Sequence, residues 1–235
     1  MLTSSPSAAD GPAGHSMDTD SPFEFDEELE DPSTSYFNDD VRTLTQWWVN
    51  ERCAPEILPY QDELVRSLLE MVEAQTSILE TKTSDTADGA FLNVLYQQEM
   101  ERIKFVIRSY LRTRLAKIQK YTAFFLREPE FRGRLSEEEL AFAENLQQLL
   151  EKHFTKSCLE GLPPFLTRLD DQAGDSSMVS MPDLEDAVIC RILEDIGEFQ
   201  LEDSSETIVM RKNNIYILRY KSIRRLLEED KVELL

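Results

Sequence analysis

Apolar positions recur at helical spacing through the first two thirds of the chain. From residue 41 they follow the repeat of a helix with one buried side: Val41, Leu44, Trp47 and Trp48. Pro55 and Pro59 interrupt this pattern, and proline is tolerated in the first turn of a helix but not in its interior. The pattern therefore predicts a helix over about 41–53 and a second helix that begins near Pro59 and fades in the polar stretch 81–89.

The longest predicted helix runs from about Ala90 to Leu126, a stretch without Gly or Pro. Its apolar positions lie three to five residues apart: Leu95, Met100, Ile103, Ile107, Leu111, Leu115 and Ile118. At 1.5 Å per residue such a helix would span about 50 Å, which is more than a small domain needs for its own core. We therefore expect part of its apolar surface to face a partner.

A fourth helix has a clear start at Ser136. Serine is a good N-cap, and Glu139 three residues later completes a capping box. Leu135 and Leu140 occupy the positions of a hydrophobic staple. The apolar repeat then continues to Phe154, and Pro163-Pro164 closes this part of the chain.

After residue 182 the apolar period changes from the helical value to two, which is typical of strands. Strands are predicted over 187–193, 199–201, 207–210, 215–220 and 232–235, with a short helix over 222–227. We therefore expect an α+β protein. An all-α domain of about four helices occupies 41–165, a linker 166–182, and a small β-rich domain 183–235.

The net charge of -21 is unevenly spread, because residues 1–40 contain eleven Asp and Glu and no Lys or Arg. Such a segment cannot bury enough apolar surface to offset its ordering entropy, so we expect an acidic disordered tail. Phe23, Phe25 and Leu29 form an apolar island within it. The island is either a short docking motif that folds on binding or a chance cluster in a solvated tail.

The strong acidity disfavours binding to nucleic acid or an anionic membrane through the overall field. Three distant cysteines, Cys53, Cys158 and Cys190, argue for a reducing compartment. The residues after Met1 show no basic-then-apolar segment, so no secretory signal is expected. No run of about 18 apolar residues is present, so no membrane-spanning segment is expected.

No nucleotide-binding, hydrolase or metalloprotease motif occurs in the sequence. His153 and Cys158 lie on or near one helix, but no third residue is evident that would orient them as a nucleophilic pair. The Cys and His content cannot supply a metal site, and no cofactor is expected. Paired carboxylates remain open by number alone, although clusters such as 137–139 and 170–171 fit a helix start and a solvated loop better.

The long helix carries a local excess of positive charge. Residues 102–120 contain seven Lys and Arg and no acid, and Lys104, Arg108 and Arg112 are spaced by four on one face. Three interpretations compete: pairing with acidic helices of this chain such as 137–145, docking of an acidic partner surface, or contact with nucleic-acid phosphates. Pairing within the protein or with a subunit is favoured, because acids are so abundant elsewhere.

Three blocks of the sequence resemble the Sld-five type subunits of the GINS complex, an accessory factor of the eukaryotic replicative helicase. The block 48–60 resembles their N-terminal motif, and its sequence is similar to that of fungal members. The block 99–118 resembles their long central helix, and the blocks 217–227 and 230–235 resemble their C-terminal end. The blocks are collinear and together cover most of residues 45–235.

The resemblance implies a helical A domain followed by a β-rich B domain, in a heterotetramer with three Psf-type subunits. It further implies a nuclear complex that joins the Mcm ring and the RecJ-like Cdc protein as the active helicase, without a catalytic site of its own. It also suggests that the island in the acidic tail docks a Ctf-type replisome hub. The expected partner-contact residues are Phe23, Phe25, Leu29, Trp47, Trp48, Lys104, Arg108, Arg112, Arg219 and Tyr220.

A structural interaction subunit is thus the leading hypothesis. A helical DNA-binding protein that uses the basic face of the long helix is the second, and a hydrolase built on carboxylates the third. Charge and motif content favour the first over both.

Overall fold

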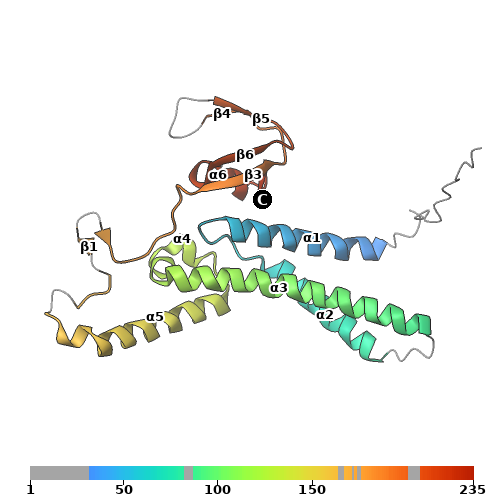
Figure 1. Ribbon diagram of the computed structural model, residues 1–235, viewed down its shortest axis with the longest axis horizontal. Coiled ribbons are helices and arrows are strands. Elements are labelled where there is room, and N and C mark those ends of the chain that lie inside the picture. The colour runs from blue at the N-terminus through green and yellow to red at the C-terminus, as the bar shows by residue number, and fades with distance from the viewer. Residues whose placement is uncertain (1–31, 82–86, 164–166, 171, 174–175, 201–206) are drawn as a thin grey trace, which may run out of the picture.

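The computed structural model describes residues 32–81, 87–163, 167–170, 172–173, 176–200 and 207–235. A helical part is followed by a small antiparallel sheet part, which confirms the expected α+β class (Figure 1). The helices of the first part are α1 (Pro32–Cys53), α2 (Asp62–Thr81), α3 (Ala87–Arg127), α4 (Pro129–Arg132), α5 (Glu137–Ser157) and the 3-10 turn η1 (Leu159–Gly161).

The first helix ends where proline predicted it to end, but it begins earlier than expected. α1 runs from Pro32 to Cys53, so residues 32–40 are helical rather than part of the acidic tail. Proline suits the first turn of a helix, because its missing N–H has no intrahelical partner there. The start of the helix was not predicted, because residues 32–40 resemble the acidic segment before them in composition. Phe23, Phe25 and Leu29 lie outside the described residues.

α1, α2 and α3 pack side by side through the apolar stripes that the sequence predicted (Figure 1). Their shared core contains Val41, Leu44, Val65, Leu68, Val72, Met100, Ile103, Val106, Ile107 and Tyr110. Complete burial of one such aliphatic side chain contributes about 1.5–3 kcal/mol. This core therefore fixes how the three helices lie relative to one another.

The long helix α3 is bent rather than continuous. Tyr121 has non-helical angles, with φ of -123° and ψ of 27°. The hydroxyl of Thr122 donates a hydrogen bond to the carbonyl of Ile118, a bond of the kind that often bends helices. Beyond the bend, Phe125 packs with Phe131 of α4, and α3 meets α5 on both sides of the bend through the cluster that contains Ile118, Phe125 and Ala143.

The start of α5 matches the sequence prediction. Ser136 is the N-cap, and its Oγ accepts a hydrogen bond from the Glu139 backbone N–H at 3.1 Å. The Glu139 carboxylate in turn accepts from the Ser136 N–H at 3.1 Å. The predicted capping box is confirmed.

The sheet part contains β3 (Ala187–Ile192), β4 (Gly197–Gln200), β5 (Thr207–Met210), β6 (Ile215–Arg219), α6 (Tyr220–Glu228) and β7 (Val232–Leu234). One antiparallel sheet has the order β6-β3-β7, and β4 pairs with β5 as a hairpin. β1 (Gln172–Ala173) and β2 (Ser176–Ser177) also pair, within the stretch that was expected to be a plain linker.

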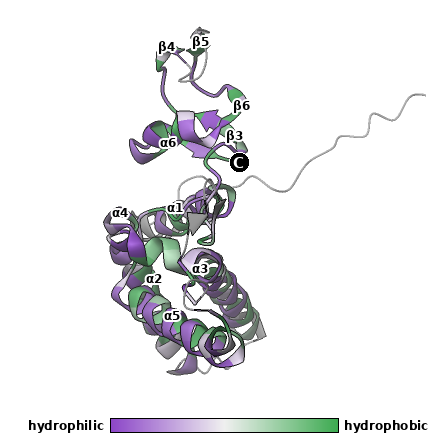
Figure 2. Ribbon diagram, turned by 90° about the vertical axis from the view of Figure 1, so that its left-hand side faces the viewer, coloured by the Kyte–Doolittle hydropathy of each residue, from purple (hydrophilic) through white to green (hydrophobic). Residues whose placement is uncertain are grey.

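The sheet part is joined to α1 by a continuous apolar core. Ala54 and Leu58, which follow α1, are buried in the same cluster as Cys190, Ile223 and Leu234 of the sheet part. Trp47 packs against both this cluster and the helical core. Figure 2 shows the sheet part standing on the α1 side of the helices. α1 therefore belongs to two cores at once.

Candidate functional site

A fully buried arginine links three segments of the helical part. Arg114 of α3 donates from Nε and Nη2 to the two carboxylate oxygens of Glu139, at 2.8 and 2.9 Å. Its Nη1 donates to Glu51 of α1 at 3.1 Å and to the Leu58 carbonyl at 2.6 Å. The second bond from Nη2 reaches the Arg134 carbonyl at 3.0 Å. All five N–H groups are used, so the buried charge is fully hydrogen-bonded.

The guanidinium of Arg114 also lies between two aromatic rings. Its Cζ is 5.2 Å from the ring centre of Tyr60 and 5.7 Å from that of Tyr110. Burial lowers the pKa of Arg114, but its hydrogen bonds to Glu139 and the charge of Glu51 outweigh this effect, and the pKa is raised overall. Burial raises the pKa of Tyr110 to about 12. At neutral pH the arginine is therefore charged and the tyrosine neutral.

Lys117, one turn after Arg114, completes the charge balance. Its Nζ donates to the other carboxylate oxygen of Glu51 at 2.7 Å, to the Glu51 carbonyl and to the Glu56 carbonyl at 2.7 Å. Burial lowers the pKa of Lys117, although the charge of Glu51 opposes this effect. These contacts hold the last turn of α1 and the loop after it against the C-terminal part of α3.

A second buried carboxylate, Glu56, connects the helical part to the sheet part. Its Oε1 accepts from Tyr220 Oη at 2.9 Å, from Arg224 Nε at 2.7 Å and from Arg134 Nη1 at 3.3 Å. Its Oε2 is buried and has no hydrogen-bond partner among the described residues. Burial and the nearby charge of Glu56 raise the pKa of Tyr220. The neutral hydroxyl is thereby kept as a donor to Glu56.

A second set of hydrogen bonds fixes the last strand on α1. Asn50 Oδ1 accepts from the Leu234 N–H at 2.9 Å and from Gln46 Nε2 at 3.1 Å. Gln46 Nε2 also donates to the Leu234 carbonyl at 3.3 Å. Together with the Glu56 contacts, these bonds give the two parts one defined mutual arrangement.

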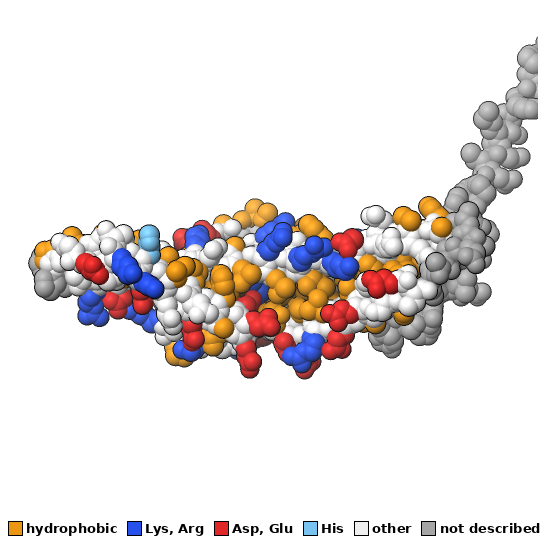
Figure 3. Space-filling model, turned by 90° about the horizontal axis from the view of Figure 1, so that it is seen from below, with side chains coloured by type: hydrophobic (Ala, Val, Ile, Leu, Met, Phe, Trp, Pro, Cys, Tyr) orange, Lys and Arg blue, Asp and Glu red, His pale blue; other side chains and the backbone are white. Residues whose placement is uncertain are grey.

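Among the described residues, many large apolar side chains remain exposed once this framework is formed, and two of the surfaces that they form lie near the α2–α3 turn and on the sheet. The first, named here the apolar tip, consists of Ile78 near the end of α2 and Phe91, Leu92, Val94, Leu95 and Tyr96 at the beginning of α3. The second is the outer face of the sheet, where Ile189 and Ile217 are paired across strands and both exposed. Figure 3, seen from the side of α2 and α5, shows hydrophobic side chains grouped between charged ones.

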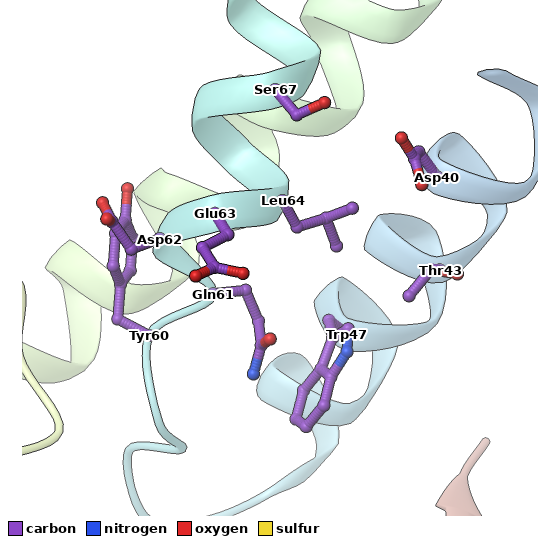
Figure 4. A pocket seen from close by; sticks show the side chains of 9 residues that line it. All are labelled: Asp40, Thr43, Trp47, Tyr60, Gln61, Asp62, Glu63, Leu64 and Ser67. Carbon is purple, nitrogen blue, oxygen red and sulfur yellow. The ribbon is translucent and has the colours of Figure 1, made fainter. Parts of the chain in front are cut away.

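The two predicted tryptophans are half-buried. Trp47 and Asp40 of α1 form one wall of a shallow pocket of about 580 Å³ between α1 and the start of α2, and Glu63 lies on the α2 side (Figure 4). Trp48 contacts Phe105 of α3 edge-to-face, with ring centres 6.2 Å apart. The nine residues that line the pocket include the carboxylates of Asp40, Asp62 and Glu63.

The predicted basic face is only partly neutralised. Lys104 and Arg108 pair with Glu101 on their own helix at 3.0 and 3.2 Å, and no ion pair engages Arg112 within the described residues. The expected pairing with helix 137–145 does occur, but at Arg114, through Glu139.

The last two expected contact residues have different environments. Arg219 is exposed and pairs with Glu185 at 2.9 Å. Tyr220 is fully buried, so it has no surface to offer a partner in this structure; its phenol instead joins the two parts through Glu56.

The sequence analysis did not predict that Arg114, Glu51 and Glu56 form buried charge networks. One signal was present: Arg114 follows Ile103, Ile107 and Tyr110 on the buried stripe of the long helix, where an arginine needs a buried partner. The partners themselves come from distant parts of the chain and have no local signature.

No conventional catalytic constellation is seen in the described part of the chain. His153 and Cys158 are both exposed on or beside α5. No group of His, Cys, Asp and Glu in these residues could hold a metal ion. Among the helices described, none is long and apolar enough to cross a membrane.

Comparison with known proteins assigns a family to this architecture. Residues 68–157 match the family described as GINS complex protein helical bundle domain, and residues 182–235 match the one described as DNA replication complex GINS protein SLD5 C-terminus. The DNA replication complex GINS protein sld5 of Schizosaccharomyces pombe is 37% identical over 86% of this chain and 94% of its own length.

Two further relatives extend this similarity. The SLD5 protein of Chaetomium globosum is 36% identical over 83% of this chain and 90% of its own length. That of Arabidopsis thaliana is 33% identical over 87% of this chain and 95% of its own length. The resemblance inferred from the residue blocks, including its fungal character, is thereby confirmed. This chain belongs to the SLD5 family of DNA replication complex GINS proteins.

Proposed function

We propose that this protein is a non-catalytic structural subunit of a nuclear GINS heterotetramer with three Psf-type subunits. The tetramer joins the Mcm ring and the RecJ-like Cdc protein to form the active replicative DNA helicase, in initiation and in fork progression. The names of the relatives, which are DNA replication complex proteins, support the replication role.

The apolar tip is the observation that carries the assembly role. Within residues 91–96, five large apolar side chains each expose between 49% and 64% of their surface. Monomeric soluble proteins rarely expose contiguous apolar patches beyond a few hundred Å², and larger patches mark interaction sites. A partner subunit that covers the tip would remove this surface from water.

The buried charges support a scaffold rather than an enzyme. The four buried charged side chains hydrogen-bond one another, so none is free to act on a substrate; they are Arg114, Glu51, Glu139 and Lys117. Such a network fixes the angles between α1, α3 and α5. A rigid frame suits a protein whose task is to hold several partners in register.

The test is co-expression with Psf-type subunits and measurement of the mass of the purified complex. The variant Phe91→Asp/Leu95→Asp should weaken assembly at least about 100-fold, because each lost apolar contact is worth about 1.5–3 kcal/mol. Met178→Asp is the matched control, since Met178 is 65% exposed and lies outside the tip. Normal assembly of the tip variant would remove the main support for the proposal.

Direct DNA binding by the basic face is the second candidate function. Arg112 has no ion pair among the described residues, and Lys104 and Arg108 share one glutamate. Phosphate contacts would give affinity that falls steeply with salt. The variant Lys104→Glu/Arg108→Glu/Arg112→Glu separates the candidates: loss of DNA affinity in an intact complex supports DNA contact, and loss of assembly supports a subunit interface.

Further contacts are proposed at the remaining predicted residues. Trp47, Trp48 and Arg219 would contribute to protein interfaces, and Phe23 to Leu29 would dock a Ctf-type replisome hub. Alanine substitution of Phe23 and Phe25, followed by pull-down with the hub protein, tests the docking role. Retention of the hub by this variant would assign its binding to another surface.

A further inference from the structure

A mixed aromatic and basic surface runs along the junction of α1 and α3. It consists of Trp48 and Arg52 of α1 and of Phe105, Arg108 and Arg112 of α3, and is named here the Arg–Trp surface. The rings of Trp48 and Phe105 meet at 87°, and the Arg52 guanidinium lies 5.4 Å from the Trp48 ring centre. Phe105 exposes 58% of its surface although it makes this contact.

The positive charge of the Arg–Trp surface is not balanced locally. Within the described residues, no ion pair engages Arg52 or Arg112, and the Glu101 that pairs with Arg108 also pairs with Lys104. This is unusual in a chain with a net charge of -21. The surface therefore suits a ligand that is both acidic and aromatic, because carboxylates pair with guanidinium groups and aromatic rings pack on the exposed rings.

The same chain contains a segment of that chemistry. Residues 22–31 include Phe23, Phe25 and Leu29 together with six Asp and Glu, and no Lys or Arg. These residues immediately precede α1, whose first residue is Pro32.

The segment also has the necessary reach. Along α1, Trp48 lies about 24 Å from Pro32 at 1.5 Å per residue. An extended chain that turned back at Pro32 would bring Phe25 about 24 Å along the helix at about 3.4 Å per residue. The same spacings per residue would place Phe23 near Arg52. The aromatic residues of the segment therefore match the positions of the aromatic and basic residues of the surface.

We infer that residues 22–31 fold back and dock on the Arg–Trp surface of their own chain. Phe25 packs against Trp48 and Phe105, and the flanking carboxylates pair with Arg52 and Arg112. Docking hides the aromatic side chains of the segment and covers the basic face of α3. A partner that captures the segment must first displace it from this surface. The inference does not depend on the proposed function.

Photo-crosslinking in the full chain within its co-expressed complex tests this inference. p-Benzoylphenylalanine replaces Phe25, the sample is irradiated, and the linked peptides are identified by mass spectrometry. A mixture of isotope-labelled and unlabelled copies of the chain distinguishes links within one copy from links between copies. We expect the main link to join position 25 to α1 or α3 of the same copy.

Charge reversal provides the specificity control. Arg52→Glu/Arg112→Glu should lower the yield of the link at least about fivefold, as expected for the loss of two charge pairs. Arg42→Glu/Arg66→Glu is the matched control: both arginines are exposed on α1 and α2 away from the surface, and the yield should stay within about twofold. Thermal melts of both variants verify that folding is unchanged.

Three outcomes would overturn the inference. One is a main link to another subunit, which would make the Arg–Trp surface or the segment an intersubunit contact. Another is a main link elsewhere on this chain, or no link at all. The third is a yield that is equal in the two charge-reversed variants.

Discussion

Replacing Arg114 with methionine would remove the side chain that connects α1, α3 and α5. Of its five hydrogen bonds, three go to carboxylate oxygens and two to backbone carbonyls. Methionine fills much of the same volume but donates nothing. Glu51 retains Lys117 and the Leu58 N–H, whereas Glu139 retains only the Ser136 N–H. The main cost is therefore a buried carboxylate at Glu139 without a cation.

Breaking a buried ion pair by removing one partner costs about 3–5 kcal/mol. For a chain of this size, 1 kcal/mol shifts the melting temperature by about 2–4 °C. Arg114→Met should thus lower the melting temperature by about 6–20 °C. The double variant Arg114→Met/Glu139→Met should recover about half of the loss, because no unpaired charge is then left at Glu139.

Thermal unfolding of the co-expressed complex, followed by circular dichroism, measures these shifts. Arg66→Met is the matched control: its ion pair with Asp62 is solvent-exposed, so the free energy of unfolding should change by less than about 0.5 kcal/mol. If Arg114→Met also fell within about 1 kcal/mol of the parent, the network would not hold the helices. Equal destabilisation of the single and double variants would contradict the charge argument in particular.

Three further predictions concern buried groups. Tyr220→Phe should lower the free energy of unfolding by about 1–3 kcal/mol, because Glu56 loses a donor; unchanged urea unfolding would exclude this role. The pKa of Tyr110 is raised from 10.0 to about 12, so its contribution to stability is complete below pH 10 and is lost as pH rises towards 12. Alkaline unfolding of parent and Tyr110→Phe measures this loss, and identical curves would refute it. Burial raises the pKa of the Cys190 thiol to about 11, so iodoacetamide should modify exposed Cys158 first, as mass spectrometry can determine.

Local rules recovered most of the secondary structure. Pro55 marks the end of α1, Ser136 and Glu139 set the start of α5, and the period-two stretch at 187–193 became β3. Each of these features depends on residues a few positions apart, which a sequence pattern records directly. The early start of α1 was missed because residues 32–40 resemble the acidic segment before them in composition.

The candidate site was less predictable because it depends on contacts distant in sequence. Arg114 meets Glu51 from 63 positions earlier, and Glu56 meets Arg224 from 168 positions later. In the sequence, Glu51, Glu56 and Arg224 look like ordinary surface charges, whereas the apolar repeat around Arg114 is a sign of burial. Tyr220 was expected to contact a partner, and nothing near it in the chain reveals its burial. The apolar tip was predicted only in general terms: the long helix exceeds what a small core needs, so part of its apolar surface was expected to face a partner.

The Glu56 contact has a consequence for how such chains can be recombined. Its carboxylate lies in the segment after α1, while Tyr220 and Arg224 belong to the sheet part. A chimera that takes its helical part from one relative and its sheet part from another would fit together only if all three residues were inherited jointly. A glutamate without the tyrosine and the arginine would keep Arg134 but lose two of its donors, and the reverse pairing would leave the buried Tyr220 hydroxyl without its acceptor. The two parts of the chain are therefore expected to diverge as one unit rather than as exchangeable modules.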